Sequence, residues 1–249
     1  MRRASSIETN FQKVEIWTST QAVEFRVAGA IHACYHRKKF LTGLVWDLIA
    51  AGALLREKGE PRSILMLGLA GGTAFRILRH LLPDCKFTAV DIDGGIIELA
   101  REHMELEALG IEVIIGDAYT WLAKNKRRFD VVFDDIYLAG KTDVFRPREW
   151  DSALMGHLKR AVAPGGLLGV NLVIGKGHRT MQSHIRRIMQ ENFPVVRSLR
   201  TPLSLNEVLI AGDSVCTRPT LLPYVPKFTT WQDRDFWKLI EVGRLKSLA

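Results

Sequence analysis

The chain has 249 residues, of which 47% are hydrophobic and 25% charged, and its formal net charge is +8. This composition is that of a globular protein and excludes a chain that is disordered throughout. The positive charge would suit acidic partners, but it is spread along the chain without a nucleic-acid-binding signature, so we expect no nucleic-acid partner.

The cysteines argue against a zinc protein, and the hydropathy pattern argues against a membrane-spanning one. Cys34, Cys85 and Cys216 are far apart and lack the CxxC or Cys/His spacing of a zinc site. No stretch approaches the roughly 20 consecutive apolar residues that a membrane-spanning helix needs. We therefore expect a cytoplasmic protein that has reduced thiols, no metal and no membrane contact.

Residues 1–59 predict a small β-hairpin followed by a helix. Residues 1–10 are polar and are expected to be loose. Phe11–Trp17 and Val23–Val27 are rich in β-branched and aromatic residues, with a polar stretch between them, which is typical of a hairpin. Apolar residues then recur at helical spacing over residues 40–55.

Residues 60–212 alternate short apolar runs with helical patterns. The expected strands are 63–67, 86–90, 111–115, 130–133, 167–172, 195–199 and 207–211. The expected helices are 73–82, 94–104, 118–124, 149–162 and 178–192. This order predicts an α/β fold with a doubly wound, mostly parallel seven-stranded sheet, whose last two strands form an antiparallel edge. Residues 213–249 predict a loop and a final helix over 233–245, both packed on this domain.

Ligands of such sheets bind at the carboxyl ends of the strands, where the strand order reverses. The first expected strand runs into a turn of small residues, whose backbone can approach a ligand closely. The free N–H groups of the next helix can then hold a polar group. We expect cofactor contacts from Gly68, Ala70, Gly71 and Gly72. The turn lacks the GxGxxG pattern of dinucleotide enzymes, which argues against a nicotinamide-dependent dehydrogenase.

Two further strand ends carry aspartates. Asp91 ends the second strand, where a carboxylate can accept hydrogen bonds from ribose hydroxyls, and Ile92 follows it. Asp93 is expected mostly to cap the next helix. Asp117 follows the third strand beside Ala118, and it either accepts from an adenine amino group or caps a helix. These residues extend the expected nucleotide site.

The glycine turn, both aspartates and a Pro-Gly-Gly turn at 164–166 together resemble class I S-adenosylmethionine-dependent transferases, a Rossmann-like superfamily, over roughly residues 60–212. Within it the chain resembles spermidine synthase and its shorter relatives. The resemblance implies that Gln12 touches the cofactor, since it matches a family Tyr-Gln pair. His32 stands where a cofactor-contacting Gln is usual, which implies a place in the substrate site; a partly packed histidine without a site role is the alternative.

The fourth strand ends in Asp134, Asp135, Ile136 and Tyr137, where aminopropyltransferases carry their active-site motif. The resemblance implies that Asp135 is the base or orients an amine, or else positions the cofactor. Tyr137 would position substrate or stack on the cofactor. Asp134 is expected to face away from the site, because neighbours on a strand point to opposite faces.

Several positions depart from the aminopropyltransferase pattern. Leu138 stands in place of a second carboxylate, Gly71 replaces an Asp in the glycine turn, and Lys38–Lys39 replace an acidic pair. Two lysines beside a diamine would repel it. The turn and the Asp-x-Tyr ending instead resemble divergent spermidine synthase-like proteins.

The sequence thus favours an enzyme that transfers a group from S-adenosylmethionine, or from its decarboxylated form, to a small-molecule acceptor. The missing acidic residues favour the intact cofactor and methyl transfer or a related reaction. Two alternatives stay open: an aminopropyltransferase that uses decarboxylated S-adenosylmethionine, and a non-catalytic binding module with this fold. The aromatic tail leaves a homodimer open.

Overall fold

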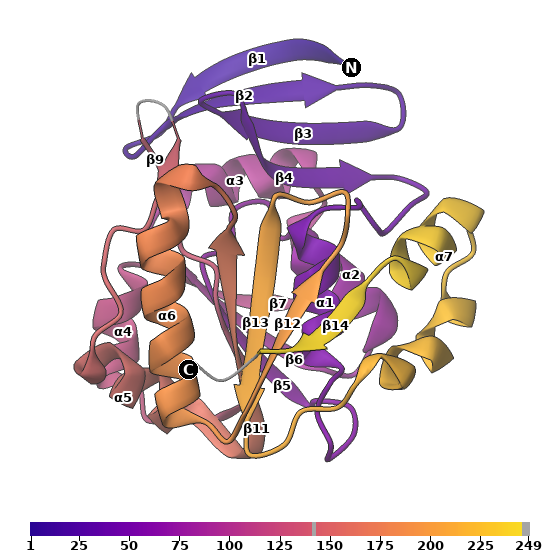
Figure 1. Cartoon of the computed structure of the whole chain (residues 1–249). Coiled ribbons are helices and arrows are strands. Elements are labelled where there is room, and N and C mark those ends of the chain that lie inside the picture. The colour runs from indigo at the N-terminus through magenta and orange to yellow at the C-terminus, as the bar shows by residue number, and fades with distance from the viewer. Residues whose placement is uncertain (141–142, 246–249) are drawn as a thin grey trace.

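The computed structural model describes residues 1–140 and 143–245, and it is built around an eight-stranded sheet (Figure 1). Its strands are β5 (Ser63–Leu67), β6 (Lys86–Asp91), β7 (Ile111–Ile115), β8 (Phe129–Asp134), β11 (Val162–Val173), β12 (Val195–Arg200), β13 (Asn206–Gly212) and β14 (Glu241–Arg244). They lie in the order β14-β12-β13-β11-β8-β5-β6-β7. The five strands from β11 to β7 are parallel, and β13, β12 and β14 are added by antiparallel pairing.

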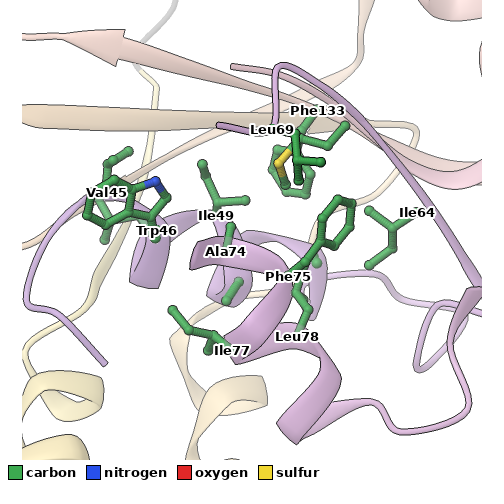
Figure 2. Close-up of a cluster of buried hydrophobic side chains, with 14 of the residues drawn as sticks. Val45, Trp46, Ile49, Ile64, Leu69, Ala74, Phe75, Ile77, Leu78 and Phe133 are labelled. Atoms are coloured by element: carbon green, nitrogen blue, oxygen red, sulfur yellow. The ribbon is translucent and has the colours of Figure 1, made fainter. Parts of the chain in front are cut away.

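Helices cover both faces of this sheet. The principal helices are α1 (Val45–Ala53), α2 (Thr73–Leu81), α3 (Gly94–His103), α4 (Ala118–Lys124), α5 (Ser152–Ala161) and α6 (Arg179–Asn192). Side chains alternate along each strand, so Val131 and Phe133 of β8 join the core under α1–α3, while Val132 joins the core under α4–α6. Figure 2 shows the first core, in which side chains of α1 and α2 pack together with Ile64 and Phe133. The predicted doubly wound α/β class is confirmed.

The N-terminal region is a four-stranded antiparallel sheet rather than a single hairpin. Its strands are β1 (Arg2–Glu8), β2 (Lys13–Thr18), β3 (Ala22–Val27) and β4 (Ala30–His36). It lies across one end of the large sheet (Figure 1), and its buried side chains, including Phe25 and Val27, join the core under α1–α3. The expectation that residues 1–10 are loose is wrong: β1 is held by backbone pairing with β2, although all seven of its residues are exposed.

The C-terminal region also differs from the prediction. Residues 233–245 do not form one helix: α7 (Trp231–Lys238) ends early, and β14 follows it as the eighth strand of the large sheet. Pairing with β14 satisfies the backbone groups along the open edge of β12, which a helix could not do. The remaining short elements are η1 (Leu106–Leu109), β9 (Leu138–Ala139), β10 (Val144–Phe145), η2 (Lys176–His178) and η3 (Arg218–Lys227). The division of the chain at residues 59 and 212 stays a prediction.

The chain order creates one topological switch point. From β5 the chain moves outward to β6 and β7, and it then returns to place β8 on the other side of β5. The connections that follow β5 and β8 therefore leave toward opposite faces of the sheet, which forms a crevice outside the carboxyl ends of these two strands. Within the described residues, no helix has both the length and the apolar composition that crossing a membrane requires.

Candidate active site

A cavity of about 340 Å³ opens at the carboxyl ends of β5, β6 and β8, at the switch point. The N-terminal sheet contributes to its wall through Phe11, Gln12 and the start of β4. Trp46 of α1 closes another side and also belongs to the core beneath it. The volume suits one small organic ligand.

The glycine turn after β5 divides its residues between the cavity and the packing. Gly68 lines the cavity with φ +89°, and a Cβ there would lie 2.6 Å from the backbone oxygen of Asp135. Only glycine permits this close approach of the two strand ends. Ala70 also lines the cavity, whereas Gly71 and Gly72 are not among its lining residues. A Cβ on Gly71 would lie 2.4 Å from that of Ala33, so this glycine lets the turn pack against β4.

Asp91 is fixed at the cavity by backbone donors. The N–H groups of Leu69 and Ala70 donate to its Oδ2 at 2.7 and 2.9 Å, and the N–H of Asp93 donates to its Oδ1 at 3.0 Å. Each carboxylate oxygen has two lone pairs, so Oδ1 can accept a further bond. Ile92 lines the cavity beside it.

Asp93 links the N-terminal sheet to this site. Its Oδ1 accepts from the N–H groups of Gly95 and Ile96, which confirms the predicted helix cap. Its Oδ2 accepts from the hydroxyl of Thr9 and from Nε2 of Gln12, at 2.7 and 3.0 Å. Gln12 lines the cavity, and its amide nitrogen is engaged with Asp93, so its contact with a cofactor stays a prediction.

Of the two roles that the sequence left open for Asp117, the helix cap is confirmed, and contact with an adenine stays a prediction. Asp117 caps α4, with Oδ1 accepting from the N–H of Thr120 at 2.7 Å, and it lines the cavity together with Ala118. The three strand-end aspartates, Asp91, Asp117 and Asp135, therefore face one common space.

Asp135 is the one lining carboxyl group with a strongly raised pKa. Burial raises it from the ordinary value of 3.8 to about 7, and a hydrogen bond from Nδ2 of Asn171 at 2.7 Å opposes that rise. Nδ2 of Asn206 in turn donates to Oδ1 of Asn171 at 2.9 Å, which fixes the orientation of that amide. A carboxyl group with a pKa near neutrality can exchange a proton at physiological pH.

Asp134 points to the other side of β8, as predicted. It is fully buried and accepts from Nη1 of Arg146 at 2.9 Å, from Nε1 of Trp150 at 2.8 Å and from the hydroxyl of Tyr119. The same guanidinium lies 4.6 Å from the ring of Tyr137. This cluster supports the cavity wall from behind.

Tyr137 and His32 both line the cavity, in different states. The hydroxyl of Tyr137 donates to the backbone oxygen of Asn171 at 3.0 Å and accepts from the N–H of Val173 at 3.2 Å. Its ring is therefore the part that a ligand would meet. Nε2 of His32 is buried and has no hydrogen-bond partner among the residues that the structure describes, and burial lowers the pKa of this imidazole. A buried neutral imidazole nitrogen without a partner favours a ligand that supplies one.

The charge of the cavity wall is one-sided. Asp91, Asp93, Asp117, Asp135 and Asp143 line it, and its described lining residues include no lysine or arginine. Such a wall favours a positively charged ligand group. Within residues 1–140 and 143–245, no group of three or more His, Cys, Asp or Glu side chains forms a metal site, and the absence of a metal stays a prediction.

Sequence reasoning missed the polar residues behind the predicted site. Asn171 interrupts the apolar strand β11, which is a visible signal, but a lone asparagine does not reveal its partner. Arg146 lies in an irregular segment, and nothing in its sequence context distinguishes it from a surface arginine. Asn206 begins β13 and is brought to the cavity only by the pairing of β13 with β11.

The chain was compared with protein families, curated proteins and solved structures. The model of the spermine/spermidine synthase domain matches residues 46–210. A probable polyamine aminopropyl transferase of Bifidobacterium longum is 28% identical over 164 residues, covering 66% of this chain and 35% of that protein. An eEF1A lysine and N-terminal methyltransferase homolog of Drosophila pseudoobscura is 27% identical over 190 residues, covering 73% of this chain and 27% of that protein. The chain thus spans about a third or less of these two relatives.

The solved structures show the same fold. A probable spermidine synthase from Corynebacterium glutamicum has a TM-score of 0.72 at 17% identity, covering 98% of this chain and 91% of that one. Human methyltransferase-like protein 13, solved in complex with SAH, has a TM-score of 0.55 at 20% identity, covering 78% of this chain and 90% of that one. The fold is therefore one that both spermidine synthases and a methyltransferase adopt.

Proposed function

Because this chain belongs to the spermine/spermidine synthase domain family, we propose that it transfers an alkyl group from an S-adenosylmethionine-type donor to an amine. One observation carries the proposal: Asp91, Asp117 and Asp135, at the ends of three different strands, line a single cavity at the switch point. A nucleoside needs acceptors for its ribose hydroxyls and its base, and an amine needs a carboxylate.

The residues present fit an adenosyl group. Asp91 would accept from the ribose hydroxyls, because its Oδ1 can take a further hydrogen bond. Phe11, Ile92 and Ala118 offer apolar surface for the base beside the carboxylate of Asp117. The buried Nε2 of His32 offers one more polar contact. When bound, such a donor supplies a carbon that its positively charged sulfur makes electrophilic.

Asp135 would take the proton of the acceptor. An alkylammonium group must lose a proton before its nitrogen can act as a nucleophile. The carboxyl group of Asp135, with a pKa of about 7, is partly ionised at neutral pH, and Asn171 holds one of its oxygens at 2.7 Å. We assign Asp135 the role of base and of amine-orienting group, and the ring of Tyr137 the role of a wall for the acceptor.

We favour intact S-adenosylmethionine and methyl transfer. Leu138 lines the cavity where the aminopropyltransferase pattern has a second carboxylate, so one anchor for a diamine is missing. Lys38 and Lys39 replace a further acidic pair of that pattern.

The second candidate is aminopropyl transfer from the decarboxylated donor. The acidic wall favours this reaction, because the decarboxylated compound carries a free ammonium group and no carboxylate. A carboxylate would find no lysine or arginine among the described residues that line the cavity.

Calorimetric titration tests the proposal. The purified protein is titrated with S-adenosylmethionine, its decarboxylated form, S-adenosylhomocysteine and methylthioadenosine. We expect binding, with preference for the intact donor and its thioether product, and a matching rise in melting temperature. Asp91→Ala should abolish binding, whereas Asp84→Ala, an exposed carboxylate at the opposite end of the sheet, should not change it. Failure of all four compounds to bind would overturn the proposal. Binding without transfer to any amine would support a non-catalytic module.

A further inference from the structure

Large apolar side chains are exposed at or next to residues that line the cavity. Four of them come from different segments: Ile31, Phe145, Ile174 and Leu205. Leu205 is 78% exposed and Phe145 is 47% exposed, which is costly for side chains of this size unless something covers them. We call these four residues the apolar rim.

Each member of the apolar rim is tied to the cavity wall. Ile31 lines the cavity itself, and Phe145 pairs across the β9–β10 hairpin with the lining residue Leu138. Ile174 follows the lining residue Val173, and Leu205 precedes the lining residue Asn206. The N–H of Ile174 donates to the backbone oxygen of Leu205 at 2.7 Å, so these two segments lie side by side.

The cavity and the apolar rim together describe an acceptor with two parts. The interior offers carboxylates to a cation, whereas the entrance offers apolar surface to something larger. A free polyamine carries charge along its whole length and would bury little apolar surface on the rim. A polypeptide with a lysine or a free α-amino group can present one cation to Asp135 and place neighbouring apolar side chains on the rim.

We infer that the apolar rim docks a polypeptide segment whose primary amine enters the cavity and is alkylated there. This inference rests on the proposed function. The ammonium group gives one proton to the carboxylate of Asp135, and the nitrogen lone pair forms the new C–N bond to the carbon on sulfur. The C–S bond breaks at the same time, and its electron pair stays on sulfur, which becomes a neutral thioether. The nitrogen is positively charged once this bond has formed, so the alkylated amine leaves directly as an ammonium ion, and Asp135 returns the proton that it took to solvent.

The test uses the whole chain and two kinds of acceptor. S-adenosylmethionine and its decarboxylated form, each radiolabelled in the transferable group, are offered with an arrayed peptide library or with free diamines and triamines. Each peptide has a single lysine or free α-amine and varied flanking residues. We expect label to enter peptides with apolar residues beside the amine, and not the free polyamines.

Variants of the apolar rim identify the docking surface. Leu205→Asp and the double variant Ile174→Ser/Leu205→Ser should raise the KM for peptide about tenfold while kcat stays the same. Their affinity for S-adenosylmethionine, measured by calorimetry, should be unchanged. Leu222→Asp is the matched control, because Leu222 is 51% exposed on η3 and does not line the cavity. It should leave every value unchanged.

The outcomes separate the two proposals. Transfer to free polyamines alone, or rim variants that alkylate peptides as well as the wild type, would overturn the docking inference and leave the proposed function standing. A wild-type chain that binds no adenosyl compound would overturn both.

Discussion

The two sides of the end of β8 differ sharply, although consecutive aspartates occupy them. Asp134 faces α4 and α5, where a guanidinium, an indole N–H and a phenol surround it and match its charge. Asp135 faces the cavity, where one amide donates to it and where the described lining residues include no lysine or arginine. Two identical consecutive residues thus have different surroundings, and only Asp135 is presented to the cavity.

This difference explains why only one of the two is suited to catalysis. Burial raises the pKa of Asp135 to about 7, and only the amide of Asn171 and the more distant Arg146 oppose that rise appreciably. Asp134 is the charge that compensates the buried Arg146, whose side chain is 3% exposed. A group that is needed as a permanent counter-charge cannot also exchange protons with a substrate. The predictions below test this division of roles.

Asp134→Asn should cause the largest loss of stability. The substitution leaves the guanidinium of Arg146 buried without its counter-charge, which costs about 3–5 kcal/mol in comparable buried pairs. Urea unfolding followed by fluorescence would measure the loss. The double variant Asp134→Leu/Arg146→Met removes both charges and should recover most of it. A loss below about 1 kcal/mol, typical of an exposed pair, would show that the ion pair is not the support that we describe.

Asp135→Asn should have the opposite profile. Removing the base should lower turnover about 10²–10⁴-fold, the usual contribution of general base catalysis. Stability at neutral pH should be higher than that of the wild type, because a neutral amide replaces a carboxyl group that burial disfavours when ionised. The affinity for adenosyl compounds, measured by calorimetry, should persist. Turnover equal to the wild type with the donor still bound would exclude Asp135 as the base.

The pH dependence of transfer should follow the ionisation of Asp135. The carboxyl group accepts a proton only when it is ionised, so the rate should rise with pH, from roughly a tenth of its plateau at pH 6 through half of it at about pH 7, and level off above about pH 8. Initial rates at saturating donor between pH 5 and 9 would measure this profile. A flat profile across this range would contradict it.

The free energy of unfolding should also depend on the ionisation of Asp135, but it should fall with rising pH where the rate of transfer rises. The folded-state pKa is raised from 3.8 to about 7, so folding favours the protonated form. The stabilising contribution is full below about pH 4 and is lost as the pH rises toward about 7. Asp47 has a pKa raised in the same direction, so the informative quantity is the difference between the wild type and Asp135→Asn. That difference should grow between pH 4 and 7; a constant difference would contradict the raised pKa.

Sequence reasoning located the cavity because topology fixes it. In a parallel sheet all carboxyl ends meet at one edge, so strand order alone predicts that Asp91, Asp117 and Asp135 lie close together. Their binding roles stay predictions. The sequence could not show which residues of the glycine turn line the cavity, because a glycine can serve either the approach of a ligand or close packing. Gly71 and Gly72 allow the turn to pack closely against β4 and η1, respectively.

Two of the strands that were missed lack the signal on which such reasoning depends. β1 has no buried residue, so no apolar alternation marks it, and β14 is a four-residue edge strand interrupted by Gly243. β1 is held by backbone pairing with the neighbouring β2, and β14 by pairing with β12, which is distant in the chain. Arg146, Asn171 and Asn206 were missed for a related reason: each acts through partners that only the folded chain brings within reach.

The smallest effect should come from substitutions of the amides next to Asp135. It shows whether these amides set the pKa of Asp135 or only pack against it. Asn171→Leu removes the hydrogen bond that lowers the pKa of Asp135, so the midpoint of the pH–rate profile should move upward by about one unit. Asn206→Ala leaves that bond in place but frees the amide of Asn171 to rotate, so it should shift the midpoint in the same direction by less. A purely structural role would lower the plateau rate or the melting temperature without moving the midpoint. Because the two variants form a graded series on one oxygen, equal midpoints in both and in the wild type would show that the raised pKa of Asp135 does not depend on its amide partners.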